Sequence, residues 1–169
     1  MNDGLATTDI VDAVEIYNHA CSIVVQRDNG WYMLDYLLQQ GHRLNTNAAD
    51  DAHFKREHAA DAFGGWVNVK SETLEPDALV AALKRGDYYS SSGPEILNIQ
   101  LEQNHVIVRC SPAAAIVLTG NGARSVQLTG HDLNHAELEL EKFREHGWFR
   151  VTVAAHNRTA AWSNPIWLV

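Results

Sequence analysis

The sequence predicts an α/β domain over residues 1–92, followed by a small β-sandwich domain over residues 93–169. Strand-like and helix-like segments alternate through the first half, which is typical of an α/β domain. From Glu95 onward, short strand-like runs follow one another at intervals of roughly ten residues, which favours a β-sandwich. The small residues and the proline of residues 90–94 (SSSGP) separate the two patterns, so we place the domain boundary there.

The first half begins with a strand and a helix. Residues 13–17 (AVEIY) form a short, apolar and β-branched run, which predicts a buried strand. A helix is expected over residues 31–40, where apolar side chains recur at helical intervals, and Gly41 is its stop signal. Residues 44–49 are the next expected strand, and residues 50–53 (DDAH) follow its carboxyl end. In α/β sheets, that end of a strand is where the chemistry is usually placed.

A second strand and helix complete the α/β part. Gly64 and Gly65 precede an expected strand over residues 66–69. Pro76 and Asp77 indicate the start of a helix, because proline suits the first turn and an acid suits the positive end of the helix dipole. Gly86 is the expected end of this helix.

The second half contains seven strand-like runs. They are residues 96–101, 105–110, 115–118, 125–129, 136–140, 148–154 and 160–168. A hairpin turn is expected at residues 120–122 (GNG), because Asn-Gly supplies positive φ readily. Residues 137–145 have a helix as the alternative interpretation.

Composition excludes some classes of partner. The chain has 21 acidic and 13 basic residues and a net charge of −8, which argues against binding to a nucleic-acid backbone. Its apolar runs are only a few residues long, so we expect no membrane span. Residues 1–4 (MNDG) are acidic where a secretory signal is basic, which predicts a cytoplasmic protein. Cys21 and Cys110 are far apart in apolar segments and are expected to be reduced core thiols.

Asp51 and His53 are the sharpest local chemical feature. On an extended strand end, residues two apart point to the same side, so this carboxylate and this imidazole could bind one divalent cation. Asp50 beside them could orient a ligand or solvent. Taken alone, the spacing is also common in solvated loops.

The other histidines show less pattern. His131 and His135 are four residues apart but lack the intervening glutamate of the zinc-protease helix, so we interpret this segment as a polar turn between strands. His156 stands alone among polar neighbours and is assigned no role.

The order of the motifs resembles the C-terminal part of a PHP (polymerase and histidinol phosphatase) metal-dependent phosphoesterase. The resemblance runs through residues 13–18 (AVEIYN), 49–53 (ADDAH), 64–67 (GGWV) and 81–94, and it covers nearly the whole chain. Residues 149–151 (FRV) and 161–167 (AWSNPIW) are similar to the small β domain that follows the catalytic domain in some of these proteins.

The resemblance implies an α/β partial barrel, the C-terminal part of a β/α barrel, for the first domain. In the family the barrel holds two or three divalent ions, often zinc, manganese or iron. Its last ligand motif, Asp-x-His, matches Asp51 and His53. The implied activity is metal-assisted hydrolysis of a phosphate ester, in which the cations activate a water and neutralise phosphoryl charge.

The chain departs from the family in one respect. The family begins with a His-x-His pair, and no such pair occurs in these 169 residues. A catalytic cation usually has three or more protein ligands, so we expect a truncated form with an incomplete site and weak or no activity as an isolated chain. A partial barrel exposes sheet edges, so we also expect a homo-oligomer or a partner chain that covers them, or else a rearranged fold.

Two other functions stay open. The chain could be a noncatalytic binding or assembly module, or a metal-dependent hydrolase of another ester, because a fold does not fix a function.

Overall fold

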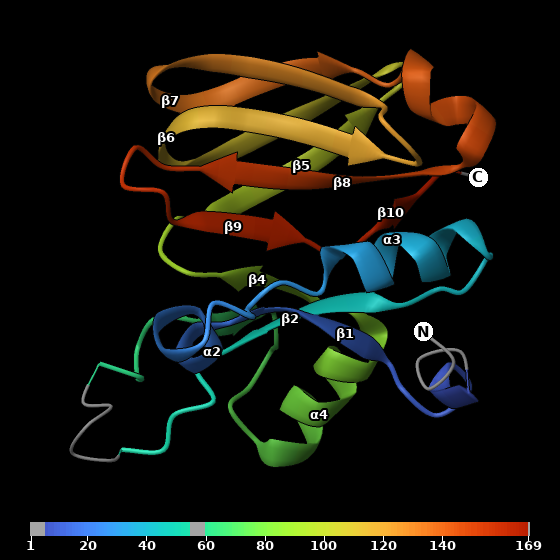
Figure 1. Cartoon of the computed structure of the whole chain (residues 1–169). Coiled ribbons are helices and arrows are strands. Elements are labelled where there is room, and N and C mark those ends of the chain that lie inside the picture. The colour runs from blue at the N-terminus through green and yellow to red at the C-terminus, as the bar shows by residue number, and fades with distance from the viewer. Residues whose placement is uncertain (1–5, 55–59, 169) are drawn as a thin grey trace. The chain divides into compact units, whose positions relative to one another are not determined.

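The computed structural model describes residues 6–54 and 60–168 and divides the chain into two compact units. Unit 1 comprises Met1–Ser90 and unit 2 comprises Ser91–Val169, so the division falls two residues before the expected boundary (Figure 1). The N-terminal residues 1–4, on which the cytoplasmic prediction depends, lie outside the described residues. None of the helices in the described residues has the length and apolar character that crossing a bilayer requires.

The described residues of unit 1 combine short strands with helices, of which α2, α3 and α4 have six to ten residues. Its elements are β1 (Ala13–Asn18), α2 (His19–Val24), α3 (Trp31–Gln39), β2 (Asn45–Ala49), β3 (Trp66–Val69), α4 (Pro76–Arg85) and most of β4 (Tyr88–Ser91). β1 and β2 pair in parallel, and β3 is hydrogen-bonded to β4.

The core of unit 1 lies between α3 and the parallel strands. Leu34, Leu37 and Leu38 are on one face of α3 and are buried, as the expected helical spacing requires. α3 packs on β1, where Ile16 is buried. Burying these side chains removes apolar surface from water, which stabilises each by about 1.5 to 3 kcal/mol.

α4 begins and ends where its sequence signals predict. Pro76 is in the first turn, where its missing N–H has no helical partner to lose. Gly86 follows the last turn with a φ of 78° and a left-handed conformation, which glycine adopts without strain.

The described residues of unit 2 form an antiparallel sheet and a short 3-10 helix. Its elements are β5 (Ile96–Glu102), β6 (His105–Gly120), β7 (Ser125–Glu139), the 3-10 helix η2 (Glu141–His146), β8 (Trp148–Ala154), β9 (Ala160–Ser163) and β10 (Ile166–Trp167). The strand order is β9-β8-β6-β5, with β7 on the other edge of β6 and β10 on β8 (Figure 1).

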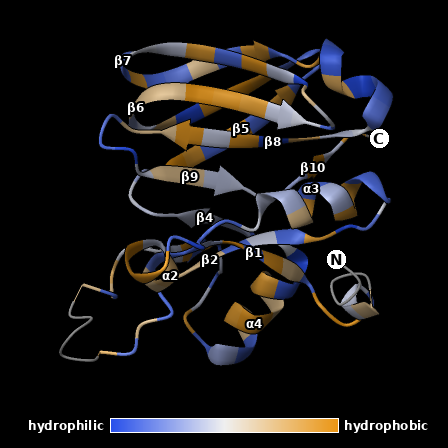
Figure 2. Cartoon of the chain, in the orientation of Figure 1, coloured by the Kyte–Doolittle hydropathy of each residue, from blue (hydrophilic) through white to orange (hydrophobic). Residues whose placement is uncertain are grey.

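β6 is the central strand of this sheet, because it pairs with β5, β7 and β8. Its first half pairs with β5 and its second half with β8, while β7 follows it along nearly its whole length. Figure 2 shows β6 as hydrophobic along most of its length, whereas β7 alternates between hydrophobic and hydrophilic residues. Val106, Val108, Ile116 and Leu118 are fully buried on β6, and Phe143 of η2 is buried as well.

The prediction of an α/β partial barrel is wrong. A β/α barrel needs successive parallel strands, each followed by a helix. Among the described residues only β1 and β2 are shown to pair in parallel, most strands are antiparallel, and there is no closed barrel.

The second domain is also simpler than predicted. Hydrogen bonds join all six strands of unit 2 in one sheet, so it is not a β-sandwich of two separate sheets. Four of the expected runs, residues 105–110 with 115–118 and residues 125–129 with 136–140, merge into the long strands β6 and β7. Residues 137–145 are divided between the end of β7 and η2, and so are not a single helix.

Candidate metal site at the end of the parallel strands

The carboxyl ends of β1 and β2 bring two polar segments together. Asn18, the last residue of β1, is in register with Ala49, the last residue of β2. Because the strands are parallel, the residues that follow them emerge at the same edge. Asp50 and Asp51 therefore lie beside Asn18.

Asn18 connects this edge to its neighbours. Its side-chain oxygen accepts a hydrogen bond from the Cys21 backbone N–H at 2.9 Å, which caps α2. Its side-chain nitrogen donates to Oδ2 of Asp51 at 3.3 Å and to Oε2 of Glu15 at 3.1 Å. The buried amide thus holds two exposed carboxylates on one side of the strand pair.

Asp50 has a different task from its neighbour. Its carboxylate accepts backbone N–H groups from Phe63 at 2.6 Å, Gly64 at 2.8 Å and Gly65 at 2.7 Å. Partial burial by itself raises the pKa of Asp50, but these three donors, together with nearby His19, outweigh it and hold the pKa below its ordinary value. Asp50 therefore fixes the loop that leads into β3.

The expectation that Asp51 and His53 stand on an extended strand end is wrong. β2 ends at Ala49, and Asp51 has a φ of 52°, in the left-handed region, so the alternation of a strand stops before it. Both side chains are exposed.

The backbone of His53 is hydrogen-bonded to a buried carboxylate. The backbone N–H of His53 donates to Oδ2 of Asp61 at 2.7 Å, and Asp61 is fully buried. Within the described part of the chain, Oδ1 of Asp61 has no hydrogen-bond partner. A buried carboxylate oxygen without a donor is costly unless something compensates it, which makes this position suitable for a cation or for another donor.

The donor set of this edge fits a metal only in part. Asp51 and His53 supply a carboxylate and an imidazole, which are suitable ligands for zinc, manganese or iron. In the described residues, however, no third donor joins them within 4.8 Å, and the one group of three such donors lies in unit 2. Unit 1 thus provides two donors of the required chemistry but not a complete site, so we derive no catalytic step through a metal here.

The group of three donors in unit 2 consists of His131, Asp132 and His156, whose ligand atoms all lie within 4.8 Å of one another. The prediction of a polar turn around His131 and His135 is wrong, because both residues belong to β7. No short sequence motif could have revealed this group, since His156 is 25 positions from His131 and comes from the loop after β8.

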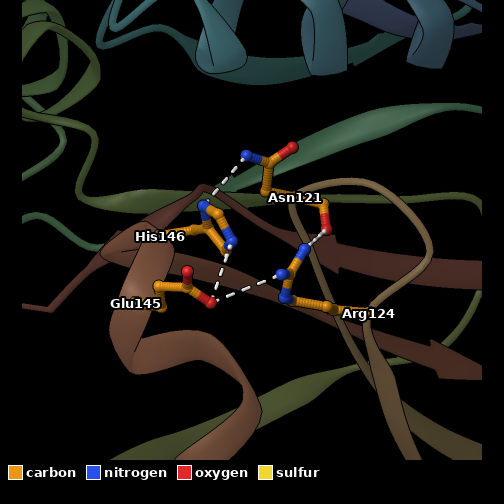
Figure 3. Close-up of polar contacts among 4 residues, drawn as sticks. All are labelled: Asn121, Arg124, Glu145 and His146. Atoms are coloured by element: carbon orange, nitrogen blue, oxygen red, sulfur yellow. Dashed lines mark hydrogen bonds and ion pairs between the residues drawn. The ribbon is translucent and has the colours of Figure 1, made fainter.

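A further polar cluster ties the β6–β7 turn to the end of η2 (Figure 3). The Asn121 amide lies 3.4 Å from Nδ1 of His146, and Arg124 donates to the Asn121 carbonyl oxygen at 3.3 Å. Oε2 of Glu145 lies 3.5 Å from the Arg124 guanidinium and 3.4 Å from Nε2 of His146. These weak and partly exposed contacts suit a structural clamp on the turn.

Comparison of the chain with protein-family models, with curated proteins and with solved structures gave no match.

Proposed function

We propose that unit 1 contributes Asp51 and His53 to a divalent-metal site, binding zinc, manganese or iron, that hydrolyses phosphate esters. The observation that carries this proposal is the edge formed by the parallel strands, where Asn18 hydrogen-bonds Asp51 and joins it to Glu15. The carboxylate of Asp61 also supports it, because one of its oxygens accepts the backbone N–H of His53 and the other is buried with no hydrogen-bond partner among the described residues. The motif resemblance to PHP phosphoesterases supplies the reaction class.

The proposal includes a partner. Two donors hold a catalytic metal weakly, because such sites usually take three or more ligands from protein. The remaining donors come from a second copy of this chain or from another polypeptide that covers the β1–β2 edge. We place this assembly in the cytoplasm, with no nucleic acid or membrane as its partner.

Metal content tests the proposal directly. The purified chain is loaded with zinc or manganese, dialysed, and analysed by mass spectrometry beside Asp51→Ala and His53→Ala variants. Asp77→Ala and His42→Ala are matched controls, because they remove the same side chains at positions away from the edge. We expect Asp51→Ala and His53→Ala to retain less metal per chain than the wild type, and the controls to retain as much as the wild type, whatever metal unit 2 holds in all of them.

Hydrolysis of a generic phosphodiester gives the second readout. We expect low turnover by the isolated chain and a further loss in the two variants. Equal metal content and equal turnover in all variants would contradict the proposal. Light scattering after size exclusion tests the partner, and a clean monomer argues against self-association.

A noncatalytic binding or assembly role is the second candidate. It is favoured by the shortage of a third donor among the described residues of unit 1. A wild-type metal content equal to that of Asp51→Ala and His53→Ala, together with a stable complex with another protein or with itself, would support this role instead.

A further inference from the structure

β7 carries a bulge that places His131 and Asp132 together on the surface. Thr129 of β7 pairs with Ala115 of β6, and Leu133 pairs with Ala113, so β7 advances four residues where β6 advances two. β7 therefore carries two extra residues in this stretch, which a β-bulge accommodates by leaving the ladder.

Two details hold the bulge in this shape. Asp132 has a φ of 54°, a left-handed conformation that aspartate tolerates better than most residues. Gly130 leaves room for the chain to fold back, since a Cβ at this position would lie 2.9 Å from the side chain of Leu133. The bulge is thus specified locally and does not need a ligand to form.

His156 reaches the bulge from the other side of β6. Ala115 pairs with Thr129 of β7 on one side and with Ala154 of β8 on the other. Because neighbouring strands are about 4.8 Å apart, β7 and β8 are separated by about 10 Å at this level. The rings of His131 and His156 nevertheless have centroids only 4.9 Å apart, since both strands leave the ladder just beyond this point.

The loop that carries His156 is itself held by hydrogen bonds. The Ala155 N–H donates to the Thr159 carbonyl oxygen at 2.9 Å, and the Arg158 N–H donates to the Ala155 carbonyl oxygen at 3.2 Å. The side-chain oxygen of Asn157 accepts both the N–H and the hydroxyl of Thr159. This tight loop fixes the backbone from which the imidazole projects.

The three side chains have the geometry of a metal site before any metal is bound. Nδ1 of His131 lies 2.8 Å from Oδ2 of Asp132, and both side chains are mostly exposed. Ligands about 2.1 Å from a tetrahedral zinc ion are about 3.4 Å from one another. Separations between 2.8 Å and 4.8 Å therefore need adjustments of about 1 Å, which exposed side chains can make.

We propose that His131, Asp132 and His156 form a surface binding site for zinc or a similar transition-metal ion, with water in the fourth position. Two imidazole nitrogens and one carboxylate oxygen are ligands that zinc prefers over magnesium or calcium. The bound ion connects the β7 bulge to the β8–β9 loop and so stabilises unit 2. The site is separate from the one proposed for unit 1 and does not depend on it.

Calorimetric titration of the full chain with zinc chloride tests this site. The parent for the titration carries Asp51→Ala and His53→Ala, so that the proposed site of unit 1 does not contribute. We expect one zinc ion to bind, and His131→Ala or His156→Ala added to this parent to weaken the affinity at least tenfold. His135→Ala is the matched control, because it removes an exposed histidine from the same strand outside the group.

Thermal unfolding supplies an independent readout. An ion that binds the folded state raises the Tm, so zinc should raise the Tm of the parent and of the His135→Ala variant but not of the other two. Similar affinity and similar Tm shifts in all variants would overturn the proposal, as would an equal loss in His135→Ala. Circular dichroism without zinc confirms that the exposed substitutions leave the fold intact.

Discussion

Asp50 offers the sharpest test of how the loop before β3 is held. In Asp50→Asn, one oxygen still accepts the N–H groups of Gly64 and Gly65, but an NH₂ group now faces the N–H of Phe63. One charge-assisted hydrogen bond is lost, and because the carboxylate is partly exposed we expect a loss of about 1.5 kcal/mol. Asp50→Ala removes all three acceptor contacts and should lose about 3 to 4 kcal/mol.

Two assays measure this effect, one on the stability of the whole chain and one at individual amides. Urea unfolding followed by circular dichroism gives the change in the free energy of unfolding. Amide hydrogen exchange by NMR reports locally, and the Gly64 and Gly65 amides should lose protection in Asp50→Ala, by tenfold or more. Asp51→Asn is the matched control, because Asp51 is exposed and asparagine, like aspartate, tolerates the positive φ of this position. We expect it to change the free energy of unfolding by no more than about 0.5 kcal/mol.

The pH dependence of Asp50→Asn tests whether the ionised form of Asp50 is the form that stabilises the fold. Since the folded pKa of Asp50 is lowered, its ionised form adds stability above the ordinary aspartate pKa of about 3.9, and this stability is lost as the pH falls through the folded value. The difference between wild type and Asp50→Asn should persist from pH 7 to pH 5 and shrink below pH 4. Equal effects of Asp50→Asn and Asp51→Asn, or unchanged exchange at Gly64 and Gly65, would refute the reasoning.

Three further predictions concern burial and backbone space. Burial, together with Asp12, raises the pKa of Tyr88 to about 12. Absorbance at alkaline pH should therefore show a late tyrosine titration, which Tyr88→Phe removes. The stability that the neutral phenol contributes should fall between pH 10 and 12. Gly30→Ala places a Cβ 2.0 Å from the Glu15 carbonyl oxygen, so its urea midpoint should fall by the equivalent of about 3 kcal/mol. Phe143→Ala empties a fully buried position and should lose about 3 to 5 kcal/mol, whereas Phe54→Ala, at a site 75% exposed, should change the free energy of unfolding little.

Local signals predicted most of the elements but not their connections. Glycine and proline mark the real ends of α4 at Pro76 and Gly86, because those residues have strong backbone preferences. Unit 2 shows the limit, because the four separate runs expected at residues 105–110, 115–118, 125–129 and 136–140 belong to the two continuous strands β6 and β7. Pro112 and Gly130 lie between those runs, where the register between β6 and β7 shifts, and a bulge lets a strand continue past a residue that cannot join the ladder.

The site residues show the same limit. Sequence order placed Asp51 after the carboxyl end of a strand, as the structure has it, because that inference needs only the end of an element. The relation of Asp51 to His53 depends on φ at a single residue, which sequence spacing does not reveal. The group around His131 depends on strand register and on a bulge, and both arise from tertiary packing.

Asp50 and Asp51 differ in their hydrogen bonds, and this difference decides which of the two carboxylates can bind a metal. Asp50 was expected to orient a ligand or solvent, yet its two carboxylate oxygens already accept three backbone N–H groups. A cation would have to compete with those donors and release the loop. Among the described residues, the Asp51 carboxylate accepts one long hydrogen bond, from Asn18 at 3.3 Å, and it is exposed. Of the two neighbours, Asp51 is therefore the carboxylate that can bind a metal while Asp50 keeps the loop in place.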